Sequence, residues 1–418
     1  MLDPSSSLAR CAGVAALALT LGCALQQPVS AQPAYFDVVR GSGPHDVAAS
    51  PQRDGPAYYT GQRNGTLGIL DPATGKVEEV PLGSQSAPHG VIVGPDGAPW
   101  ITDSGLNAIV RVDPKTRAVK SWPLPDEARS ANLNTATFDR KGRIWFTGQA
   151  GWYGRLDPAN NDMKVWRSPR GRGPYGITTT PTGDVYYVSL AGNHLARVDV
   201  ETGEATVIEP PTQRQGARRA WADTKGRIWI SYWNTGHVGM YDPATKAWKE
   251  WKLPGERPQA YSVWVDDRDQ VWLTEWSTNA IVRFDPSTER FTSYPSDRDG
   301  ARVRQMLGRS GEAWGAESGT DRLVRIGLRP EQRPGGRAVM SANEPATTNA
   351  SEMMRLLAEL EEAELYEQRL RSIIVAVRDE LAAGHTARAL SMCNQALNEI
   401  DSATDVAAPS PWMKQQGP

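Results

Sequence analysis

The side chains best suited to acid–base chemistry in this chain lie in loops that flank short β-rich segments. His45 and His89 each follow a proline in such a loop. A loop histidine can act as a general base or as a ligand near neutral pH. It can equally cap backbone groups of its own loop, so both interpretations stay open. We take His45 and His89 as the candidate catalytic bases.

Glu275 and Glu317 are the candidate carboxylates of the same chemistry. Two carboxylates that converge can hold a hard cation or contact a substrate. Alternatively, each forms a structural salt bridge, for which the candidate partners are Arg218, Arg302 and Arg304. The sequence does not assign a set of metal ligands.

These residues belong to two series of positions that recur along the chain relative to a strand aromatic. The first series lies eleven residues before the aromatic, and thirteen in the first repeat; it holds His45, His89, Asn134, Tyr175, Arg218, Tyr261 and Val303 or Arg304. The second series lies three residues after the aromatic and holds Gly61, Asp103, Gly148, Ser189, Tyr232, Glu275 and Glu317. The residue type changes from repeat to repeat while the flanks stay similar. This predicts an asymmetric site on a symmetric scaffold.

We expect a substrate-binding set at one end of that scaffold, made of Asp103, Asn134, Tyr175, Arg218, Tyr232, Tyr261, Arg304 and Trp276. Asp103 could instead fix its own turn. Trp233 and Trp276 could stack on a flat ligand, or pack between repeats. His194 and His237 fall in hairpins away from this end and receive no role. The sequence contains no nucleophile elbow, phosphate-binding loop, dinucleotide fingerprint or zinc-ligand spacing.

The scaffold that must position these side chains is an internal repeat. Its turn aspartates are spaced 42, 44, 42, 43 and 43 residues apart: Asp71, Asp113, Asp157, Asp199, Asp242 and Asp285. Each repeat contains four short β-rich runs, and the Asp-Pro-x-Thr-Gly turn suits a hairpin because Asp bonds its own backbone and Gly accepts positive φ. A period of this length is typical of propeller blades. We therefore predict an all-β, seven-bladed β-propeller over residues 34–328.

The two ends of the repeat array predict how the ring closes. The last repeat lacks an outer strand after Ile326, and a β-rich run at Tyr35–Val39 precedes the first inner strand. We expect this N-terminal strand to complete the seventh blade and lock the ends together. An open solenoid of the same repeats is the alternative.

Composition limits the partners and the compartment. The 418 residues carry a formal net charge of -2, which gives no general attraction to nucleic acid or to anionic membranes. Residues 1–31 are predicted to be a secretory signal peptide, with Arg10 before an apolar run and a small-residue cleavage site ending at Ala31. The run is too short for a transmembrane segment, so we expect a periplasmic or secreted protein; lipid anchoring at Cys23 is the alternative. Cleavage would leave Cys393 as the only cysteine.

The C-terminal part changes character. Residues 329–350 are rich in Pro, Gly and polar residues and are predicted to be a linker. Apolar residues then recur with helical spacing, which predicts an α-helical hairpin over 351–402, followed by a disordered tail over 403–418. One hairpin buries little surface, so it is either a self-contained appendage or an element for self-association or for docking a protein partner.

Two repeats carry a family resemblance. Pro-His-Gly-Val at 88–91, followed by Trp-Ile-Thr-Asp at 100–103, and Trp-Leu-Thr-Glu-Trp-Ser-Thr-Asn-Ala-Ile-Val-Arg-Phe at 272–284 resemble the streptogramin B (virginiamycin B) lyase family. The resemblance extends over about 40–328. It implies a monomeric seven-bladed propeller that opens a cyclic depsipeptide antibiotic by Mg²⁺-assisted elimination. Such a reaction needs a base for a proton next to a carbonyl and a cation for the developing enolate.

The resemblance also implies four site residues, and three of these roles lack their residue here. The family's histidine in the sixth blade corresponds to Tyr261, and its histidine in the seventh to Arg304 or Val303. The glutamate before that histidine corresponds to Arg302 or Ala301. The last glutamate has a counterpart in Glu317, displaced by one residue. Arginines at these positions would repel a cation, so the resemblance supplies Mg²⁺ only as an expectation. An analogous site rotated toward the histidines of the first two blades is the alternative.

Two functions therefore remain open. The first is an exported, metal-assisted carbon–oxygen lyase that acts on a small cyclic ester or lactone in the central funnel. The second is a non-catalytic propeller that binds a small molecule or a protein, with the hairpin as docking element. A calcium propeller similar to sugar lactonases is a third option, for which the sequence lacks a full set of acidic and Asn ligands.

Overall fold

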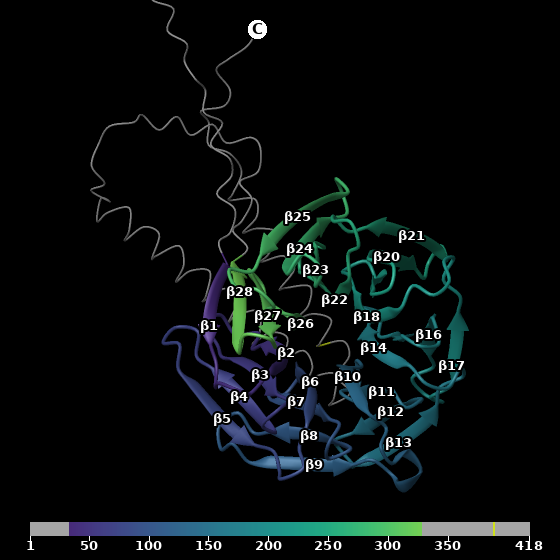
Figure 1. The fold of residues 1–418 in the computed structure, drawn as a ribbon. Helices are drawn as coiled ribbons and strands as arrows, with labels where there is room; N and C mark the ends of the chain where they lie inside the picture. The colour runs from purple at the N-terminus through teal and green to yellow at the C-terminus, as the bar shows by residue number, and fades with distance from the viewer. Residues whose placement is uncertain (1–32, 328–387, 389–418) are drawn as a thin grey trace, which may run out of the picture. The chain divides into compact units, whose positions relative to one another are not determined.

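A computed structural model of the chain describes residues 33–327 and residue 388. Four strands form each of seven separate antiparallel sheets. Figure 1 shows these sheets arranged around a central axis as the blades of a propeller. The seven-bladed all-β fold is thus confirmed. The predicted signal peptide (1–31), linker (329–350), helical hairpin (351–402) and tail (403–418) lie outside the described residues and stay predictions.

The strands occupy four concentric positions. The innermost strands are β2 (Pro44–Ala49), β6 (Pro88–Val93), β10 (Leu133–Phe138), β14 (Pro174–Thr179), β18 (Ala217–Ala222), β22 (Ala260–Val265) and β26 (Val303–Met306). The second strands are β3 (Ala57–Gly61), β7 (Pro99–Asp103), β11 (Ile144–Gly148), β15 (Val185–Ser189), β19 (Ile228–Tyr232), β23 (Val271–Glu275) and β27 (Glu312–Glu317). The third strands are β4 (Thr66–Leu70), β8 (Ala108–Val112), β12 (Trp152–Asp157), β16 (His194–Val198), β20 (His237–Asp242), β24 (Ala280–Asp285) and β28 (Arg322–Gly327). The outer strands are β5 (Val77–Pro81), β9 (Val119–Pro123), β13 (Asp162–Arg167), β17 (Ala205–Ile208), β21 (Ala247–Lys252), β25 (Arg290–Pro295) and β1 (Pro33–Asp37).

The hairpin between the third and outer strands is built as the turn chemistry predicts. Each turn aspartate accepts a hydrogen bond from the backbone N–H two residues later, at 2.9–3.0 Å, in all six turns of this kind. A short 3-10 turn, η1 (Asp126–Ala128), interrupts the loop after β9. Within residues 33–327, no helix is long and apolar enough to cross a membrane.

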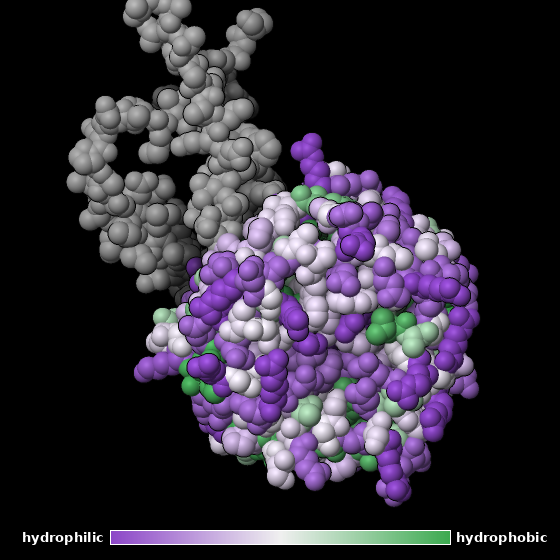
Figure 2. Space-filling model, viewed as in Figure 1, coloured by the Kyte–Doolittle hydropathy of each residue, from purple (hydrophilic) through white to green (hydrophobic). Residues whose placement is uncertain are grey.

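The strand aromatics form the core between blades. Trp145, Trp229, Trp272 and Trp314 are almost completely buried. The indole N–H of the first three donates to the aspartate six residues earlier, at 2.9–3.0 Å, so the one polar atom of each ring is satisfied. The face seen in Figure 2 is mostly hydrophilic. Among the described residues, Val39 and Val119 are the large hydrophobic side chains that lie exposed.

The N-terminal strand closes the ring as predicted. β1 pairs antiparallel with β28 and completes the seventh blade, so the two ends of the propeller lie side by side in Figure 1. The ring of Phe36 in β1 stacks on Trp314 with a centroid distance of 5.4 Å. Because every other blade is continuous in sequence, this blade alone joins the two ends.

Replacing Phe36 by alanine should therefore weaken the closure. We expect the free energy of unfolding to fall by about 1–2 kcal/mol, because a half-buried aromatic ring and its stacking on Trp314 are lost. Urea unfolding followed by tryptophan fluorescence measures the change. Val119→Ala, at an exposed position on the outer strand β9, is the matched control and should shift stability by less than about 0.5 kcal/mol. Equal effects of the two changes would contradict a closing role for β1.

Candidate functional site

A β-bulge at the start of every innermost strand aims side chains at the central axis. The register with the second strand shifts within the first residues of each innermost strand, in all seven blades. A bulge re-aims side chains, and bulges are frequent next to functional sites. Two consecutive residues of several strands consequently reach the channel, such as His45 with Asp46 and Asn134 with Thr135.

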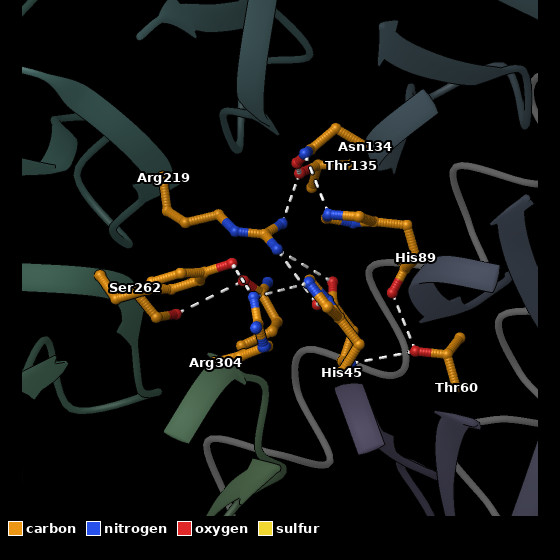
Figure 3. Close-up of polar contacts among 12 residues, drawn as sticks. His45, Thr60, His89, Asn134, Thr135, Arg219, Ser262 and Arg304 are labelled. Carbon is orange, nitrogen blue, oxygen red and sulfur yellow. Dashed lines mark hydrogen bonds and ion pairs between the residues drawn. The ribbon is translucent and has the colours of Figure 1, made fainter. Parts of the chain in front are cut away.

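Contacts between blades that are not neighbours confirm that these side chains meet. Arg219, from the fifth blade, donates to both carboxylate oxygens of Asp46 in the first blade, at 3.1 and 3.3 Å, and also to the Thr135 hydroxyl in the third blade. Tyr175 and Tyr261, from the fourth and sixth blades, hydrogen-bond through their hydroxyls at 3.2 Å. Figure 3 shows Arg219 extended toward Thr135, with His45, His89 and Arg304 around the same space.

The repeat position directly before the second series carries a hydroxyl side chain in five blades, and this hydroxyl links each of these blades to the next one. Thr60 accepts the Asp46 N–H at 3.0 Å and donates to the carbonyl of His89 in the next blade at 2.8 Å. Four further residues act in the same way: Thr102, Thr147, Ser231 and Thr274. The fourth and seventh blades carry Val188 and Ala316 at this position. Sequence reasoning missed this series, although five hydroxyl residues at one repeat position were a visible signal.

The hydrogen-bond network assigns the protons of both histidines. His45 Nδ1 lies 2.7 Å from the Asp46 carboxylate, so it carries the proton and Nε2 carries the lone pair. Arg219 donates to Thr135, whose hydroxyl donates to Asn134 Oδ1 at 2.8 Å. The Asn134 amide therefore donates to His89 Nε2 at 3.2 Å. His89 then carries its proton on Nδ1, a buried atom without a hydrogen-bond partner in the described part of the chain.

Burial and positive charge keep both rings neutral. Burial lowers the pKa of His45 well below its ordinary value, and the guanidinium groups of Arg304 and Arg219 lower it further. Burial likewise lowers the pKa of His89, with the close His45 ring, 3.9 Å away between centroids, as the next cause. Asp46 has a pKa raised by burial, against the opposing charge of Arg219.

The neutral histidines predict a loss of stability in acid. Unfolded, each histidine takes up a proton near its ordinary pKa of 6.5, whereas the folded protein keeps both neutral to lower pH. Below pH 6.5 the unfolded state binds more protons, so the free energy of unfolding should decrease as the pH falls, by about 1.4 kcal/mol per pH unit for each histidine. Urea unfolding in a pH series measures the slope. His89→Gln should remove one histidine's share, and an unchanged slope would contradict the assignment.

Tyr261 lies among three guanidinium groups. Arg304 Nη1 donates to its hydroxyl at 3.2 Å, and the Arg218 guanidinium lies over its ring, 3.8 Å from the centroid. Burial opposes ionisation of this phenol, but Arg218, Arg219 and Arg304 outweigh burial and lower the pKa of Tyr261. Burial raises the pKa of its partner Tyr175. The Tyr261 oxygen is thus the more acidic of the pair.

Aromatic rings surround the Arg218 guanidinium. Its carbon lies 4.9 Å from the centroid of Tyr175 and 5.0 Å from that of Trp233. Trp276 stacks parallel on Tyr261 at 4.8 Å and donates its indole N–H to the Val303 carbonyl at 2.7 Å. Trp233 and Trp276 meet edge to face at 5.3 Å.

The structure gathers seven of the predicted site residues at this end of the channel: His45, His89, Asn134, Tyr175, Arg218, Tyr261 and Arg304. Trp276 lies beside them. Between the two candidates at the seventh position the geometry favours Arg304, since Val303 belongs to the hydrophobic core. Two residues that sequence reasoning missed are central, Asp46 and Arg219. Each is the neighbour of a predicted residue, and the bulge that turns it inward has no evident sequence signal.

Four other predicted residues do not join this network. Both Glu275 oxygens accept hydrogen bonds from donors near its own turn, among them the N–H groups of Gln259 and Thr278, at 2.7 Å each. Glu317 pairs with Arg322 at 2.7 Å. Neither pairs with Arg218, Arg302 or Arg304 within residues 33–327, so the proposed salt-bridge partners are corrected to Arg322 for Glu317 and to turn donors for Glu275.

Asp103 and Tyr232 are likewise engaged inside their own blades. Asp103 accepts backbone N–H groups at 2.9–3.0 Å from Ala87, Gly105 and Leu106, which are the contacts of a residue that fixes its turn. Tyr232 is buried in the core of the fifth blade with its ring against Gly239, and burial raises its pKa. Side chains at the second series therefore support the blades rather than the channel.

Divalent cations fit this arrangement poorly. His45, Asp46 and His89 place three potential ligand atoms within 4.8 Å of one another. However, Arg219 already holds the Asp46 carboxylate, and Arg304 Nη1 lies 3.3 Å from His45 Nε2. At the positions where the family resemblance implies Mg²⁺ ligands stand Tyr261, Arg304 and the ion-paired Glu317. The residues present do not fit Mg²⁺ there, because guanidinium groups repel a cation.

A cavity lies at the opposite end of the innermost strands from this network. It measures about 510 Å³ and its lining includes Thr137, Asp139, Asp223 and Asp266. The three aspartates accept hydrogen bonds from backbone N–H groups of their own turns and from the indole N–H groups of the neighbouring tryptophans. Their carboxylates are thus committed to the scaffold.

Comparisons with known proteins agree with this architecture. A solved streptogramin B lyase structure superposes with a TM-score of 0.65 at 21% identity, covering 71% of this chain and 97% of that one. Virginiamycin B lyase from Staphylococcus aureus gives a TM-score of 0.64 at 21% identity, covering 71% and 99%. Among curated proteins, a gluconolactonase from Zymomonas mobilis is 32% identical over 137 residues; the match covers 28% of this chain and 37% of the gluconolactonase.

A family model decides the relationship. The model of the Virginiamycin B lyase family matches residues 29–257, which is more than half of the chain. The matched segment includes the first five blades and with them His45, Asp46, His89 and Arg219. On this match, and on the seven-bladed fold that it shares with the solved lyases, the chain belongs to the virginiamycin B lyase family.

Proposed function

We propose that this protein is a lyase that opens a small cyclic ester or lactone at the bulged end of the central channel, with His45 as the base. The observation that carries the proposal is the pairing of His45 with Asp46 on one side and Arg304 on the other. The carboxylate orients the imidazole so that the Nε2 lone pair faces the guanidinium, 3.3 Å away. A base and a fixed positive charge at this separation suit proton removal next to a carbonyl.

The reaction is an elimination. His45 Nε2 takes the proton from the carbon next to a carbonyl. The electron pair of that C–H bond forms a carbon–carbon double bond, and the bond from the adjacent carbon to the ester oxygen breaks. The ester oxygen leaves as part of a carboxylate, so the ring opens without consuming water. Arg304 stabilises the negative charge that develops on the carbonyl oxygen.

His45 is a better candidate for the base than His89. The Asp46 carboxylate accepts the Nδ1 proton of His45 at 2.7 Å, whereas among the described residues no carboxylate hydrogen-bonds the His89 ring. The Nε2 atoms of the two rings face hydrogen-bond donors alike, Arg304 for His45 and Asn134 for His89. The roles of Glu275 and Glu317 as cation or substrate ligands receive no support from their contacts, which saturate both carboxylates. The names of the relatives, two lyases and a lactonase, agree with a cyclic ester or lactone as the substrate class.

Product mass distinguishes the proposed chemistry from hydrolysis. The full chain is incubated with a streptogramin B depsipeptide and with cyclic esters whose ring oxygen lies on the carbon β to a second carbonyl, and with glucono-δ-lactone as a reporter of hydrolysis. The products are examined by mass spectrometry. Elimination gives an opened product of unchanged mass with a new conjugated double bond, whereas hydrolysis adds one water. Intact substrates throughout, or products that have gained water, would refute the lyase proposal.

A second function has an observation in its favour. The box of Trp233, Tyr175 and Tyr261 around Arg218 resembles a binding site more than a reaction centre, which suits a non-catalytic ligand-binding propeller. For both functions we propose export through the signal peptide at 1–31. The predicted hairpin at 351–402 would be the docking or self-association element in the second, and its deletion should then change the oligomeric state or the co-purifying proteins.

A further inference from the structure

The mouth of the channel carries positive charge that no carboxylate balances. Arg219 is paired with Asp46. Arg218 and Arg304 form no ion pair with any residue of the described propeller. The Arg304 guanidinium donates to the Ser318 hydroxyl at 3.0 Å and approaches His45 Nε2 and the Tyr261 hydroxyl, none of which is a carboxylate. Arg218 contacts aromatic rings and has a buried Nε without a hydrogen-bond partner in residues 33–327.

Both guanidinium groups lie against one ring. The Arg218 carbon is 3.8 Å and the Arg304 carbon 5.7 Å from the centroid of Tyr261. Both guanidinium groups therefore border the same ring, and this is where we place a small ligand. The side chains of Arg218 and Arg304 are half-buried, so they are partly dehydrated yet open to the channel. Charge-assisted hydrogen bonds from guanidinium to carboxylate are strong in such surroundings because screening by water is reduced.

The surroundings add a planar, apolar surface. Trp276 lies parallel to Tyr261 with 5° between the planes, and Trp233 stands edge-on to both rings. The Trp276 indole is fixed by the Val303 carbonyl. Rigid rings of this kind favour flat ligands. The family resemblance places a cation and its ligands at Tyr261 and Arg304, and the structure has two guanidinium groups beside the Tyr261 ring there instead.

We propose that Arg218 and Arg304 form a carboxylate subsite, and that the natural ligand is an anion with a flat portion that packs on Trp233 and Trp276. The inference deepens the proposed function by naming a substrate class, namely cyclic esters or lactones that carry a carboxylate. It rests on that function only for turnover, because binding to the subsite requires no reaction.

Calorimetric titration of the full chain with benzoate, benzamide and inorganic phosphate tests the subsite. Benzamide has the shape of benzoate without its charge. We expect benzoate to bind at least about 10-fold more tightly than benzamide or phosphate. The affinity for benzoate should decrease as salt is added. Equal affinity for benzamide would overturn the anionic subsite, and tighter binding of phosphate would overturn its assignment to carboxylates.

Variants locate the binding. Arg218→Gln and Arg304→Gln should each weaken benzoate binding by about 10-fold or more. Arg197 lies on the third strand of the fourth blade and forms an exposed ion pair with Asp184. Arg197→Gln breaks this pair and should leave the affinity for benzoate unchanged. Melting curves of all three confirm that they fold. If neither Arg218→Gln nor Arg304→Gln weakens benzoate binding, the proposal is overturned.

The same measurements keep the two proposals apart. Benzoate binding without turnover of any ester supports the subsite and removes the lyase function. Turnover of an ester without measurable benzoate binding would contradict the carboxylate subsite and support the lyase function.

Discussion

Arg219→Met is expected to lower the free energy of unfolding by about 3–5 kcal/mol, because it leaves the Asp46 carboxylate buried without its cation. Both side chains are only 1% exposed, and the guanidinium bonds both carboxylate oxygens. The pair joins the first and fifth blades across the channel, so its loss also removes a contact between distant parts of the ring. Urea unfolding at neutral pH gives the value.

Two controls separate the buried charge from lost packing. The double variant Asp46→Asn with Arg219→Met removes both charges and should recover part of the stability. Arg197→Met, in an exposed pair with Asp184, should cost less than about 1 kcal/mol. If Arg219→Met is as stable as the parent protein, the loss of Arg219 does not leave a buried, unpaired Asp46 carboxylate, and the predicted cost is wrong.

His45→Gln is expected to reduce turnover of a cyclic ester by about 10²–10⁴-fold, the usual contribution of a general base. Glutamine keeps a donor for Asp46 but has no basic lone pair, so the effect should fall on kcat more than on KM. Initial rates with the substrate found in the product screen measure it.

The comparison variant is His237→Gln. This histidine starts β20 and its ring lies 2.8 Å from the Thr235 carbonyl, so turnover should not change. Below the ordinary histidine pKa the parent rate should stay flat as long as the protein is folded, since burial lowers the pKa of His45 well below 6.5. A His45→Gln variant with unchanged turnover, measured in a folded protein, would exclude His45 as the base.

Much of the fold follows from local chemistry that repeats. The turn aspartates bond their own backbone in six turns, and the strand tryptophans pack at one level between blades. The closing strand was predictable because one repeat lacked its outer strand and one spare β-rich run preceded the array. Each of these features depends on residues close in sequence.

Part of the site was predictable for the same reason. Loops at equivalent repeat positions must meet at one end of a closed ring, which brought His45, His89, Asn134, Tyr175, Arg218, Tyr261 and Arg304 to the channel. Predictions for the second series were poorer. Glu275 and Asp103 stand at strand ends, where a side chain can face the channel or fold back onto its turn, and the hydrogen bonds of the turn decided the outcome.

The sequence by itself determined the number of blades, their closure and the end of the ring where unlike side chains gather, because a fixed period repeats the same local preferences. The tertiary structure alone decided which charges are balanced. Asp46 and Arg219 are separated by 173 residues, and only the bulges and the ring bring them together. That pairing leaves Arg218 and Arg304 without a counter-charge, since a carboxylate can neutralise only the guanidinium that the fold places within hydrogen-bonding distance.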